Sequence, residues 1–313
     1  LLAIPFFHAT GAFAILIPSL LRGDKIVSMY KWDAGKALPI IEEEKVTAVG
    51  GVPAIAWQLL EHPDRDKYDL SSIAAISYGG APSAPELVST IKKRFPDAAP
   101  GNGWGMTETC ATATLNIGED YVNRPQSAGA PPKAVELKVV NPEGETLPAG
   151  EVGEVLLTSP AVMKGYWNNS AATIDTLRDG WVHTGDVGRL DHESFLYLVD
   201  RKKDMIISGG ENIYSREVEE ALASHPAVKD CAVIGVKDEY WGETVRAIVV
   251  RSAEISEEAL IAHCRTQIAS YKKPKSVLFV DELPRLPSGK INKVTLRKSH
   301  GAPDSARSDH GQG

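Results

Sequence analysis

Short apolar runs alternate with amphipathic stretches over the first 110 or so residues, and this alternation narrows the possible folds most strongly. Runs of strand length and strand composition lie at 25–29, 46–49 and 73–77. Helical patterns lie between and after them, at 34–44, 53–61 and about 84–95. Strands separated by helices of this length predict a parallel sheet with helices on its faces. Ligands bind such sheets at the carboxyl ends of the strands, where Gly79 and Gly80 follow the third strand.

The middle of the chain changes character. Residues 135–140 and 153–157 alternate apolar and polar positions, and further β signal lies at 188–190 and 195–199. We therefore expect an α/β layer over residues 1–127 and a β-rich subdomain over 128–203. Together these two parts make up what residues 1–203 contain of one large domain.

A second domain is expected from residue 204 to residue 298. Its patterns predict a helix at 216–224, strands at 228–236 and 244–250, a helix at 256–270 and a strand at 276–279. About 95 residues of this α+β kind can bury a modest core of their own. Residues 299–313 are rich in Gly, Ser, Asp and His without an apolar period, and are expected to be a disordered tail.

The composition is that of an ordinary globular protein, with 43% hydrophobic and 24% charged residues. The 34 basic and 41 acidic residues leave a net charge of −7, which argues against a nucleic-acid partner. The three cysteines form no CxxC pair, which indicates neither a disulfide framework nor a zinc site. Their scatter fits a reducing, cytoplasmic location.

The first 21 residues contain no Lys, Arg, Asp or Glu, so a membrane span or signal peptide is one interpretation. However, Pro5, His8, Gly11 and Pro18 interrupt the run, and no basic region precedes it. A buried strand followed by a buried helix is the better prediction, and no transmembrane segment is expected.

Residues 200–214 combine charge, an apolar pair and a glycine pair in fifteen positions. The cluster 201–204 offers charges for a sugar or phosphate, and 205–207 has the composition of a short buried strand. Gly209 and Gly210 allow a ligand to approach the backbone closely, because glycine has no Cβ and tolerates positive φ. A solvated charged loop is the alternative for this segment alone. Three further motifs argue against it: residues 101–109, 184–186 and 287–293.

The ordered set of four motifs resembles the adenylate-forming superfamily, which includes acyl- and aryl-CoA synthetases, luciferases and the adenylation domains of peptide synthetases. The resemblance extends from Pro5 to Lys293. In that family a Ser/Thr/Gly-rich phosphate loop ending in Pro-Lys-Gly precedes the segment that resembles residues 5–8, and no such loop occurs here. We therefore expect the C-terminal part of a longer enzyme.

The resemblance implies an AMP-forming acid–thiol ligase that uses ATP, Mg²⁺ and CoA. A carboxylate is converted to acyl-AMP and then to acyl-CoA, most like the fatty-acid branch. An aryl-CoA ligase and an adenylation domain that loads a carrier protein are alternatives within the superfamily. A non-catalytic fragment that binds only nucleotide or acyl ligands is an alternative of another class.

The resemblance also assigns site residues. Thr107 offers a hydroxyl to phosphate and Glu108 a carboxylate to Mg²⁺, which takes few protein carboxylates. Trp104 corresponds to the aromatic residue that stacks on adenine, and Asp186 and Arg201 to the groups that contact the ribose. His8 is expected beside the reacting carboxylate. The complete nucleotide-binding set is Gly79, Gly80, Ala81, Pro82, Asn102, Gly103, Trp104, Gly105, Met106, Thr107, Asp186 and Arg201.

Lys290 corresponds to the catalytic lysine that bridges the attacking carboxylate and the α-phosphate. Lys203 occupies the position where the family hinges its mobile C-terminal domain. CoA is expected at Ser208, Gly209, Gly210 and Trp241. The family usually has Gly immediately before the arginine, whereas this chain has Asp200, which leaves the local backbone conformation open.

Taken singly, several of these residues have simpler interpretations. A packing role in the core is the alternative for Trp104; taken alone, Asp186 would be a turn residue after Gly185 and His8 a structural histidine. Lys290 alone would be a solvated lysine. The acyl group cannot be inferred from the sequence, and the expected partners are a fatty or aromatic carboxylic acid and CoA, with a homo-oligomer left open. Because the phosphate loop is not found, we expect residues 1–313 alone to be poorly soluble and inactive, with residues 12–21 partly exposed.

Overall fold

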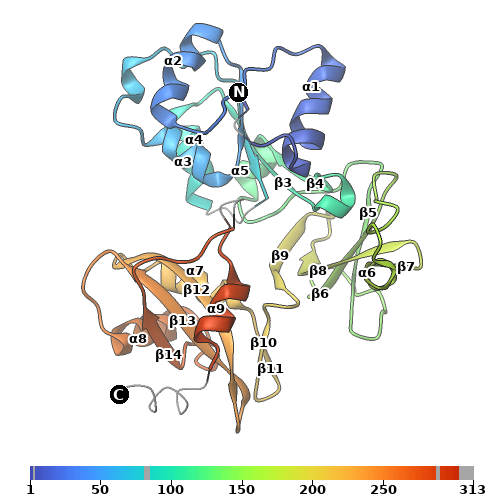
Figure 1. Cartoon of the computed structure of the whole chain (residues 1–313), viewed down its shortest axis with the longest axis vertical. Helices are drawn as coiled ribbons and strands as arrows, with labels where there is room; N and C mark the ends of the chain where they lie inside the picture. The colour runs from blue at the N-terminus through green and yellow to red at the C-terminus, as the bar shows by residue number, and fades with distance from the viewer. Residues whose placement is uncertain (3, 81–84, 287–289, 303–313) are drawn as a thin grey trace. The chain divides into compact units, whose positions relative to one another are not determined.

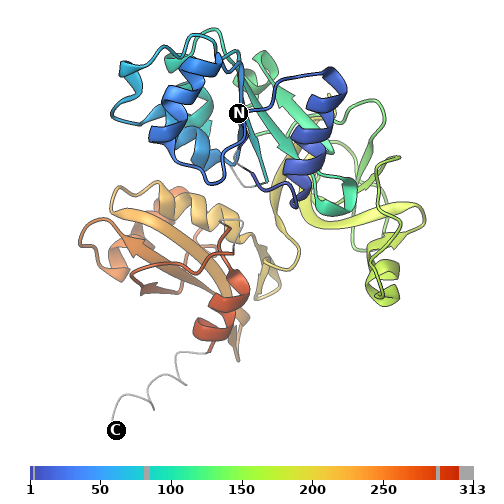
Figure 2. The same cartoon turned by 45° about the horizontal axis from the view of Figure 1, so that its top comes forward.

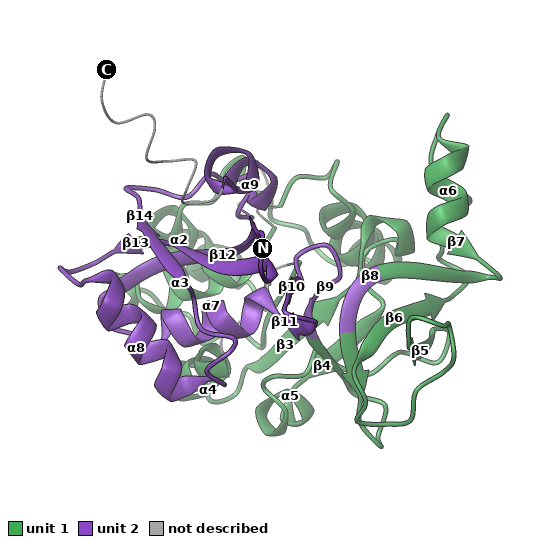
Figure 3. Cartoon of the chain, turned by 90° about the horizontal axis from the view of Figure 1, so that it is seen from below, with its two compact units in different colours: residues 1–184, 188–198 green, residues 185–187, 199–313 purple. Residues whose placement is uncertain are grey.

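The computed structural model describes residues 1–2, 4–80, 85–286 and 290–302. The chain divides into two compact units (Figure 3). Unit 1 comprises Leu1–Thr184 and Gly188–Leu198, and unit 2 comprises Gly185–Val187 and Val199–Gly313. The division therefore falls before Val199, whereas the sequence placed it after Lys203.

The first sheet of unit 1 has the order β1-β2-β3-β4, and Figure 1 labels its strands β3 and β4. Strands β1 (Ala48–Gly51), β2 (Ala75–Gly79) and β3 (Ala99–Trp104) are parallel, and β4 (Thr114–Ile117) is antiparallel to β3. The predicted parallel α/β layer is thus confirmed. Strands β1 and β2 each begin two residues after the start predicted from the sequence.

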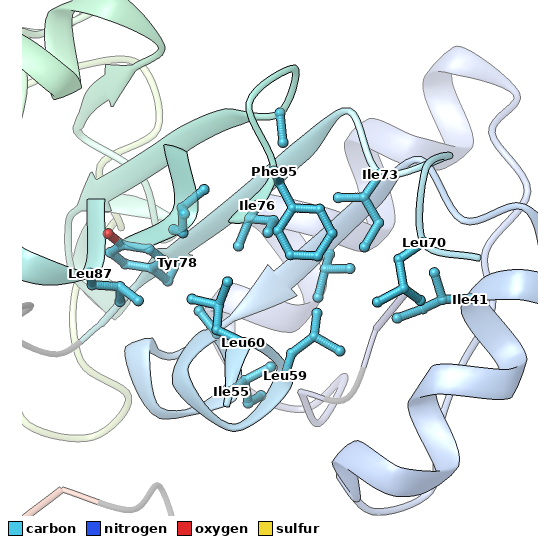
Figure 4. Close-up of a cluster of buried hydrophobic side chains, with 14 of the residues drawn as sticks. Ile41, Ile55, Leu59, Leu60, Leu70, Ile73, Ile76, Tyr78, Leu87 and Phe95 are labelled. Atoms are coloured by element: carbon cyan, nitrogen blue, oxygen red, sulfur yellow. The ribbon is translucent and has the colours of Figure 1, made fainter. Parts of the chain in front are cut away.

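Helices α2 (Ala34–Glu44), α3 (Pro53–Leu60) and α4 (Pro85–Arg94) follow the pattern predicted from the sequence. Helix α2 has the predicted bounds because both of its ends are marked locally. The Asp33 side chain accepts a hydrogen bond from the Lys36 amide at its start, and Lys45 adopts the left-handed conformation at its end. The apolar faces of these helices meet the sheet in one buried cluster that includes Leu59, Ile76 and Leu87 (Figure 4).

The N-terminal segment differs from the expectation. Leu2 forms single bridges to Gly50 and Ser28, so the strand expected at 25–29 is reduced to one bridge. A π-helical turn (Thr10–Leu16) continues into α1 (Ile17–Arg22). Figures 1 and 2 show α1 apart from α2 and α3, on the other side of the strands, where a Cβ on Gly50 would touch Ile15.

The helix expected to be buried is instead partly exposed. Leu20 is 63% exposed and Leu21 83% exposed. The prediction of partial exposure over residues 12–21 is confirmed, and the prediction of a buried helix is wrong. Among the described residues, none of the helices has the length and apolar character needed to cross a membrane.

The second sheet has the order β5-β6-β8-β7, with β9 paired to β8. It belongs to unit 1 except for residues 185–187 of β8 and 199–201 of β9, which belong to unit 2. Its core includes Val155, Leu157, Val182 and Leu196. It confirms the expected β-rich subdomain. The strands are β5 (Glu136–Val140), β6 (Gly153–Thr158), β7 (Leu177–Arg178), β8 (Trp181–Leu190) and β9 (Leu196–Arg201). Short helices in unit 1 are α5 (Glu119–Asn123), α6 (Ser170–Thr176) and the 3₁₀ turns Arg65–Lys67 and Thr107–Thr109.

Unit 2 is a five-stranded sheet with helices on both faces. The sheet has the order β11-β10-β13-β12, and β14 pairs with β13. One face packs on α7 and α8 through residues such as Val233 and Ala247, and the other packs on α9 through Ile234 and Ile248. The strands are β10 (Ile206–Ser208), β11 (Glu211–Ile213), β12 (Val228–Asp238), β13 (Gly242–Arg251) and β14 (Ser276–Phe279); the helices are α7 (Ser215–Ala223), α8 (Glu257–Gln267) and α9 (Lys293–His300).

Two features of unit 2 were not predicted. Strand β11 turns back on β10, and α9 extends to His300, so Ser299 and His300 belong to a helix and not to a disordered tail. The remaining tail residues, from 303 onward, lie outside the described residues.

The cysteines differ in environment. Cys231 and Cys264 are free thiols buried in unit 2, where burial raises their thiol pKa values to about 12 and about 11. Cys110, in unit 1, is partly exposed.

Candidate functional site

The glycine-rich segments predicted to bind nucleotide lie at one end of the first sheet. Gly79 on β2 is paired with Gly103 on β3, and a Cβ on Gly79 would lie 2.6 Å from the Gly103 carbonyl oxygen. The chain then turns at Gly80, whose φ is +73°. The structure therefore brings Gly79, Gly80, Asn102 and Gly103 together at the carboxyl ends of two parallel strands. Ala81 and Pro82 lie outside the described residues.

Trp104 ends β3 and is only 9% exposed. It belongs to a buried cluster with Ala113, Ala128 and Val155, and Met106 packs against this cluster. The core role that the sequence left open for Trp104 is thus observed, while its stacking on adenine remains a prediction. Gly105 follows at a point where the backbone is crowded, since a Cβ there would lie 1.6 Å from the Ala111 carbonyl oxygen.

Thr107 and Glu108 lie in the 3₁₀ turn that follows. The buried Thr109 hydroxyl holds this turn by accepting from the Met106 amide at 3.2 Å. The Tyr166 hydroxyl donates to Glu108 Oε1 at 2.6 Å, and the Met163 amide donates to the Glu108 carbonyl at 2.8 Å. The Glu108 carboxylate is therefore held in one orientation, with the Thr107 side chain exposed nearby in sequence.

Tyr166 was not singled out by sequence reasoning. Burial raises the pKa of Tyr166, and its hydrogen bond to Glu108 acts in the same direction, against a smaller effect of Thr176. Tyr166 is 58 residues from Glu108, so no local pattern could have linked them. Tyr166 also lines an open surface hollow of about 580 Å³ together with Trp167, Asn169, Ala172, Asp175 and Thr176.

The residues 107–108 fit a magnesium ion of the kind that binds a nucleotide. Mg²⁺ commonly takes one or two protein carboxylates and completes its octahedron with phosphate oxygens and water. Glu108 supplies one oriented carboxylate. Within the described part of the chain, no group of three or more His, Cys, Asp or Glu side chains could hold a metal by itself.

Unit 2 brings three of the predicted site residues together. Arg201 Nε lies 3.0 Å from Asp186 Oδ1, and Asp186 is 7% exposed. The Lys290 side chain is solvent-exposed, but partial desolvation lowers the pKa of its ammonium; the Arg201 guanidinium adds to this effect and Asp186 opposes it. The predicted ribose-contacting residues and the predicted catalytic lysine thus influence each other electrostatically. The residues 287–289, which precede Lys290, lie outside the described residues.

Asp200 stands where the family usually has Gly before the arginine, and its carboxylate contacts three neighbouring residues. Its Oδ1 accepts from the Arg201 amide at 2.7 Å and from the Ser215 hydroxyl at 3.3 Å, and Oδ2 lies 3.4 Å from the Arg216 amide. Asp200 thereby satisfies donors at the start of α7 as a capping carboxylate does. Lys203, the predicted hinge, is exposed in the turn between β9 and β10.

Three of the four predicted CoA-binding residues, Ser208, Gly209 and Gly210, lie at the tip of a two-residue hairpin. Ser208 pairs with Glu211, and Gly209 and Gly210 have φ values of +60° and +85°, which fit the tight turn. The Gly209 amide donates to the Trp241 carbonyl at 2.8 Å, and a Cβ on Gly209 would lie 2.7 Å from the indole ring. Trp241 is 46% exposed and packs edge-to-face on Tyr240. Ser208, Gly209, Gly210 and Trp241 are therefore neighbours.

His8 directly precedes the helical N-terminal segment. Its Nδ1 accepts from the Thr10 amide at 3.3 Å, and its own amide donates to the Pro5 carbonyl at 3.1 Å. These local bonds match the structural interpretation of His8. Its place beside a reacting carboxylate remains a prediction.

Comparison with known proteins identifies the family. Residues 1–167 match the AMP-binding enzyme family, and residues 217–290 match the C-terminal domain of AMP-binding enzymes. The chain belongs to the adenylate-forming, AMP-binding enzyme family. Several of the proteins it resembles are acyl- or aryl-CoA ligases.

A feruloyl-CoA synthase from Amycolatopsis is 42% identical over 303 residues, covering 96% of this chain and 61% of the relative. A long-chain-fatty-acid–CoA ligase from Mycobacterium tuberculosis is 39% identical, covering 96% of this chain and 59% of the relative. The structure of o-succinylbenzoate CoA synthetase from Bacillus subtilis with its acyl-adenylate intermediate has a TM-score of 0.87 and 35% identity, covering 95% of this chain and 60% of that chain. The chain therefore spans about three fifths of the length of these relatives.

Proposed function

We propose that this chain forms part of an ATP-dependent acid–thiol ligase. A carboxylate attacks the α-phosphate of ATP to give acyl-AMP and pyrophosphate; the thiol of CoA then displaces AMP to give acyl-CoA. Family membership supports this proposal, and so does the same Bacillus synthetase solved with ATP and a magnesium ion, which is 34% identical. Free, buried thiols at Cys231 and Cys264 support the cytoplasmic location expected from the sequence.

The grouping of Asp186, Arg201 and Lys290 within unit 2 carries the proposal. Attack of a carboxylate on a phosphate brings two anions together, so positive charge is needed where they meet. Lys290 supplies an ammonium on a long side chain for this purpose, with its pKa lowered by desolvation and by Arg201. Asp186, oriented by Arg201, offers carboxylate oxygens to the ribose hydroxyls.

In unit 1, Glu108 and Thr107 are the residues that would hold Mg²⁺. The ion, when bound, neutralises charge on the phosphates. The chain's own contribution is orientation: the Tyr166 hydroxyl fixes one oxygen of the Glu108 carboxylate. Main-chain groups at the ends of β2 and β3 allow a nucleotide to approach, because Gly79, Gly80 and Gly103 present no side chain.

CoA is proposed at the hairpin tip of unit 2. Trp241 offers a half-exposed aromatic face, and Gly210 leaves open space where a Cβ would point. A pantetheine arm is long and narrow, and such a surface suits it because no side chain of Gly209 or Gly210 obstructs it.

Fatty acids are the first proposed substrate class, as for the Mycobacterium ligase. An aromatic carboxylate is the second candidate, and the 42% identity to a feruloyl-CoA synthase favours it specifically. A carrier-protein thiol in place of CoA remains the alternative acceptor. Turnover with a panel of fatty and cinnamic acids, with CoA or a carrier protein as acceptor, distinguishes these candidates.

The test separates the two half-reactions. In a preparation that shows ATP–pyrophosphate exchange, Lys290→Ala should nearly abolish exchange and leave thioester formation from supplied acyl-AMP largely intact. Lys298→Ala, at an exposed position of α9, is the matched control and should change neither. Equal loss of both half-reactions would contradict the role of Lys290. Tight ATP binding by calorimetry without turnover would favour the non-catalytic alternative.

A further inference from the structure

Helix α9 begins three residues after Lys290 and carries two cationic side chains one turn apart. Asn292 caps the helix by accepting from the Thr295 amide at 3.1 Å. Lys293 and Arg297 are four residues apart, so they project from the same side of the helix. Their side chains are connected to the segment that carries Arg201 by separate sets of contacts within unit 2. Figure 3 shows α9 in unit 2.

The first route runs through Arg297. Its guanidinium donates to the Lys203 carbonyl oxygen at 3.2 Å and forms an ion pair with the Asp204 carboxylate. The Asp204 side chain is 12% exposed, which protects the pair from water. Arg297 therefore holds the turn that directly follows Arg201.

The second route runs through Lys293. Its ammonium lies 2.7 Å from Glu219 Oε1 and donates to the Ser215 hydroxyl, also at 2.7 Å. Ser215 is fully buried, and its hydroxyl donates to Asp200. Asp200 in turn binds the Arg201 amide. Lys293 is thus connected to the residue that directly precedes Arg201.

Glu219 connects Lys293 to the sheet of unit 2. Its Oε1 also accepts from the Val233 amide at 2.8 Å, on β12, an edge strand of the sheet. The carboxylate is shared between a sheet amide and the Lys293 ammonium. A bond to the sheet prevents Lys293 and Glu219 from moving together as a loose surface pair.

Helix α9 itself is anchored on the sheet. Leu296 is 2% exposed and packs with Ile234, Val236 and Ile248. Arg246, also 2% exposed, donates to the His300 and Ala302 carbonyl oxygens at 2.7 and 2.9 Å beyond the last turn. The helix is therefore a rigid support whose polar side faces residues 200–204.

We propose that α9 is a positioning element: Lys293 and Arg297 hold residues 200–204, and with them Arg201, in a fixed relation to Lys290. Both are positioning residues, because they act through Arg201 and Lys290. This inference rests on the proposed function for its effect on adenylation. The arrangement itself, however, is testable without any activity.

Hydrogen exchange in the 313-residue chain tests the arrangement. Lys293→Met and Arg297→Leu should each speed exchange in peptides covering 199–206 by about tenfold or more, the change expected when a hydrogen bond to a charged group is lost. Lys298→Met should leave these peptides unchanged. Lys293→Arg should retain most of the protection, since an arginine can pair with Glu219, and this variant controls for a general loss of folding.

ATP–pyrophosphate exchange tests the consequence. In a preparation that shows this activity, Arg297→Leu and Lys293→Met should raise the KM for ATP and lower kcat, and Lys293→Arg should restore both. Unchanged hydrogen exchange at 199–206 in both variants would overturn the positioning role, whatever the activity. Increased hydrogen exchange together with absent turnover in the unsubstituted protein would support the positioning role and count against the proposed function alone.

Discussion

Removing Lys293 should destabilise unit 2, because the Glu219 carboxylate would remain mostly buried without its cationic partner. The side chains of this ion pair are 17% and 22% exposed, so the remaining carboxylate would have little access to water. Loss of one partner of a buried pair typically costs about 3–5 kcal/mol. Because the pair retains some exposure, we expect Lys293→Met to destabilise the region around β12 by about 3 kcal/mol, the lower end of that range.

The stability that Lys293→Met loses should increase as the pH rises. Burial raises the folded-state pKa of Glu219, while Lys293 and the Val233 amide oppose the rise. Without Lys293 the pKa should rise further, since its largest opposing contribution is gone. A glutamate with a raised folded pKa destabilises the fold above its unfolded pKa and not below it. The deficit of Lys293→Met should therefore be small near pH 4 (a little below the ordinary pKa of glutamate, about 4.3) and grow as the pH rises.

Native-state hydrogen exchange of peptides from β12 and α7, corrected for the intrinsic pH dependence of exchange, measures this deficit. Adding Glu219→Gln to Lys293→Met should recover part of the loss, because a neutral amide needs no cation. Lys275→Met, which removes a half-exposed partner of Asp238 on the same strand, should have little effect. A deficit that is independent of pH and unaffected by Glu219→Gln would refute the reasoning.

Three further outcomes are expected. Gly105→Ala should lower the thermal midpoint and soluble yield, because its Cβ would lie 1.6 Å from the Ala111 carbonyl oxygen, whereas Gly103→Ala, with its nearest contact at 3.5 Å, should be tolerated; equal effects would argue against the crowding at Gly105. Glu108→Gln should lower the pKa of Tyr166 in an ultraviolet titration, with Tyr166→Phe identifying the signal, since the Glu108 anion raises that pKa; an unchanged titration would mean that the two groups are not coupled. Gly210→Leu should spare pyrophosphate exchange and suppress transfer to CoA, while Gly210→Asn, which tolerates the φ of +85°, should show less loss; equal loss of exchange in both variants would place CoA elsewhere.

The elements that the sequence predicted well are those with local signals. Helix α2 has a capping aspartate, an apolar face and a left-handed terminal residue, all within 13 positions. Helix α9 has a capping residue, Asn292, but no apolar face, because Leu296 is its one buried residue, and its cations act on partners up to 94 positions away. Helix α9 is therefore specified by tertiary contacts that a periodicity argument cannot detect.

The same distinction applies to the site. Gly79 and Gly103 could be placed together because parallel strands align their carboxyl ends. The grouping of Asp186, Arg201 and Lys290 was expected only from the order of family motifs, since 104 positions separate its first and last members. The Tyr166–Glu108 bond was missed altogether, and Asp200, an apparent departure from the family pattern, proved to cap α7.

The uneven burial of the three thiols makes the native chain suitable for site-specific labelling. Thiolates react with maleimides and thiols hardly do, so Cys231 and Cys264, with pKa values of about 12 and about 11, should remain unmodified near neutral pH. Cys110 is partly exposed, has a φ of +53° and lies two residues after Glu108. A fluorophore attached there would lie next to the proposed magnesium-binding turn of unit 1 and leave unit 2 unlabelled. Nucleotide or metal binding at that turn would then be observable as a change in emission, without removal of any native cysteine.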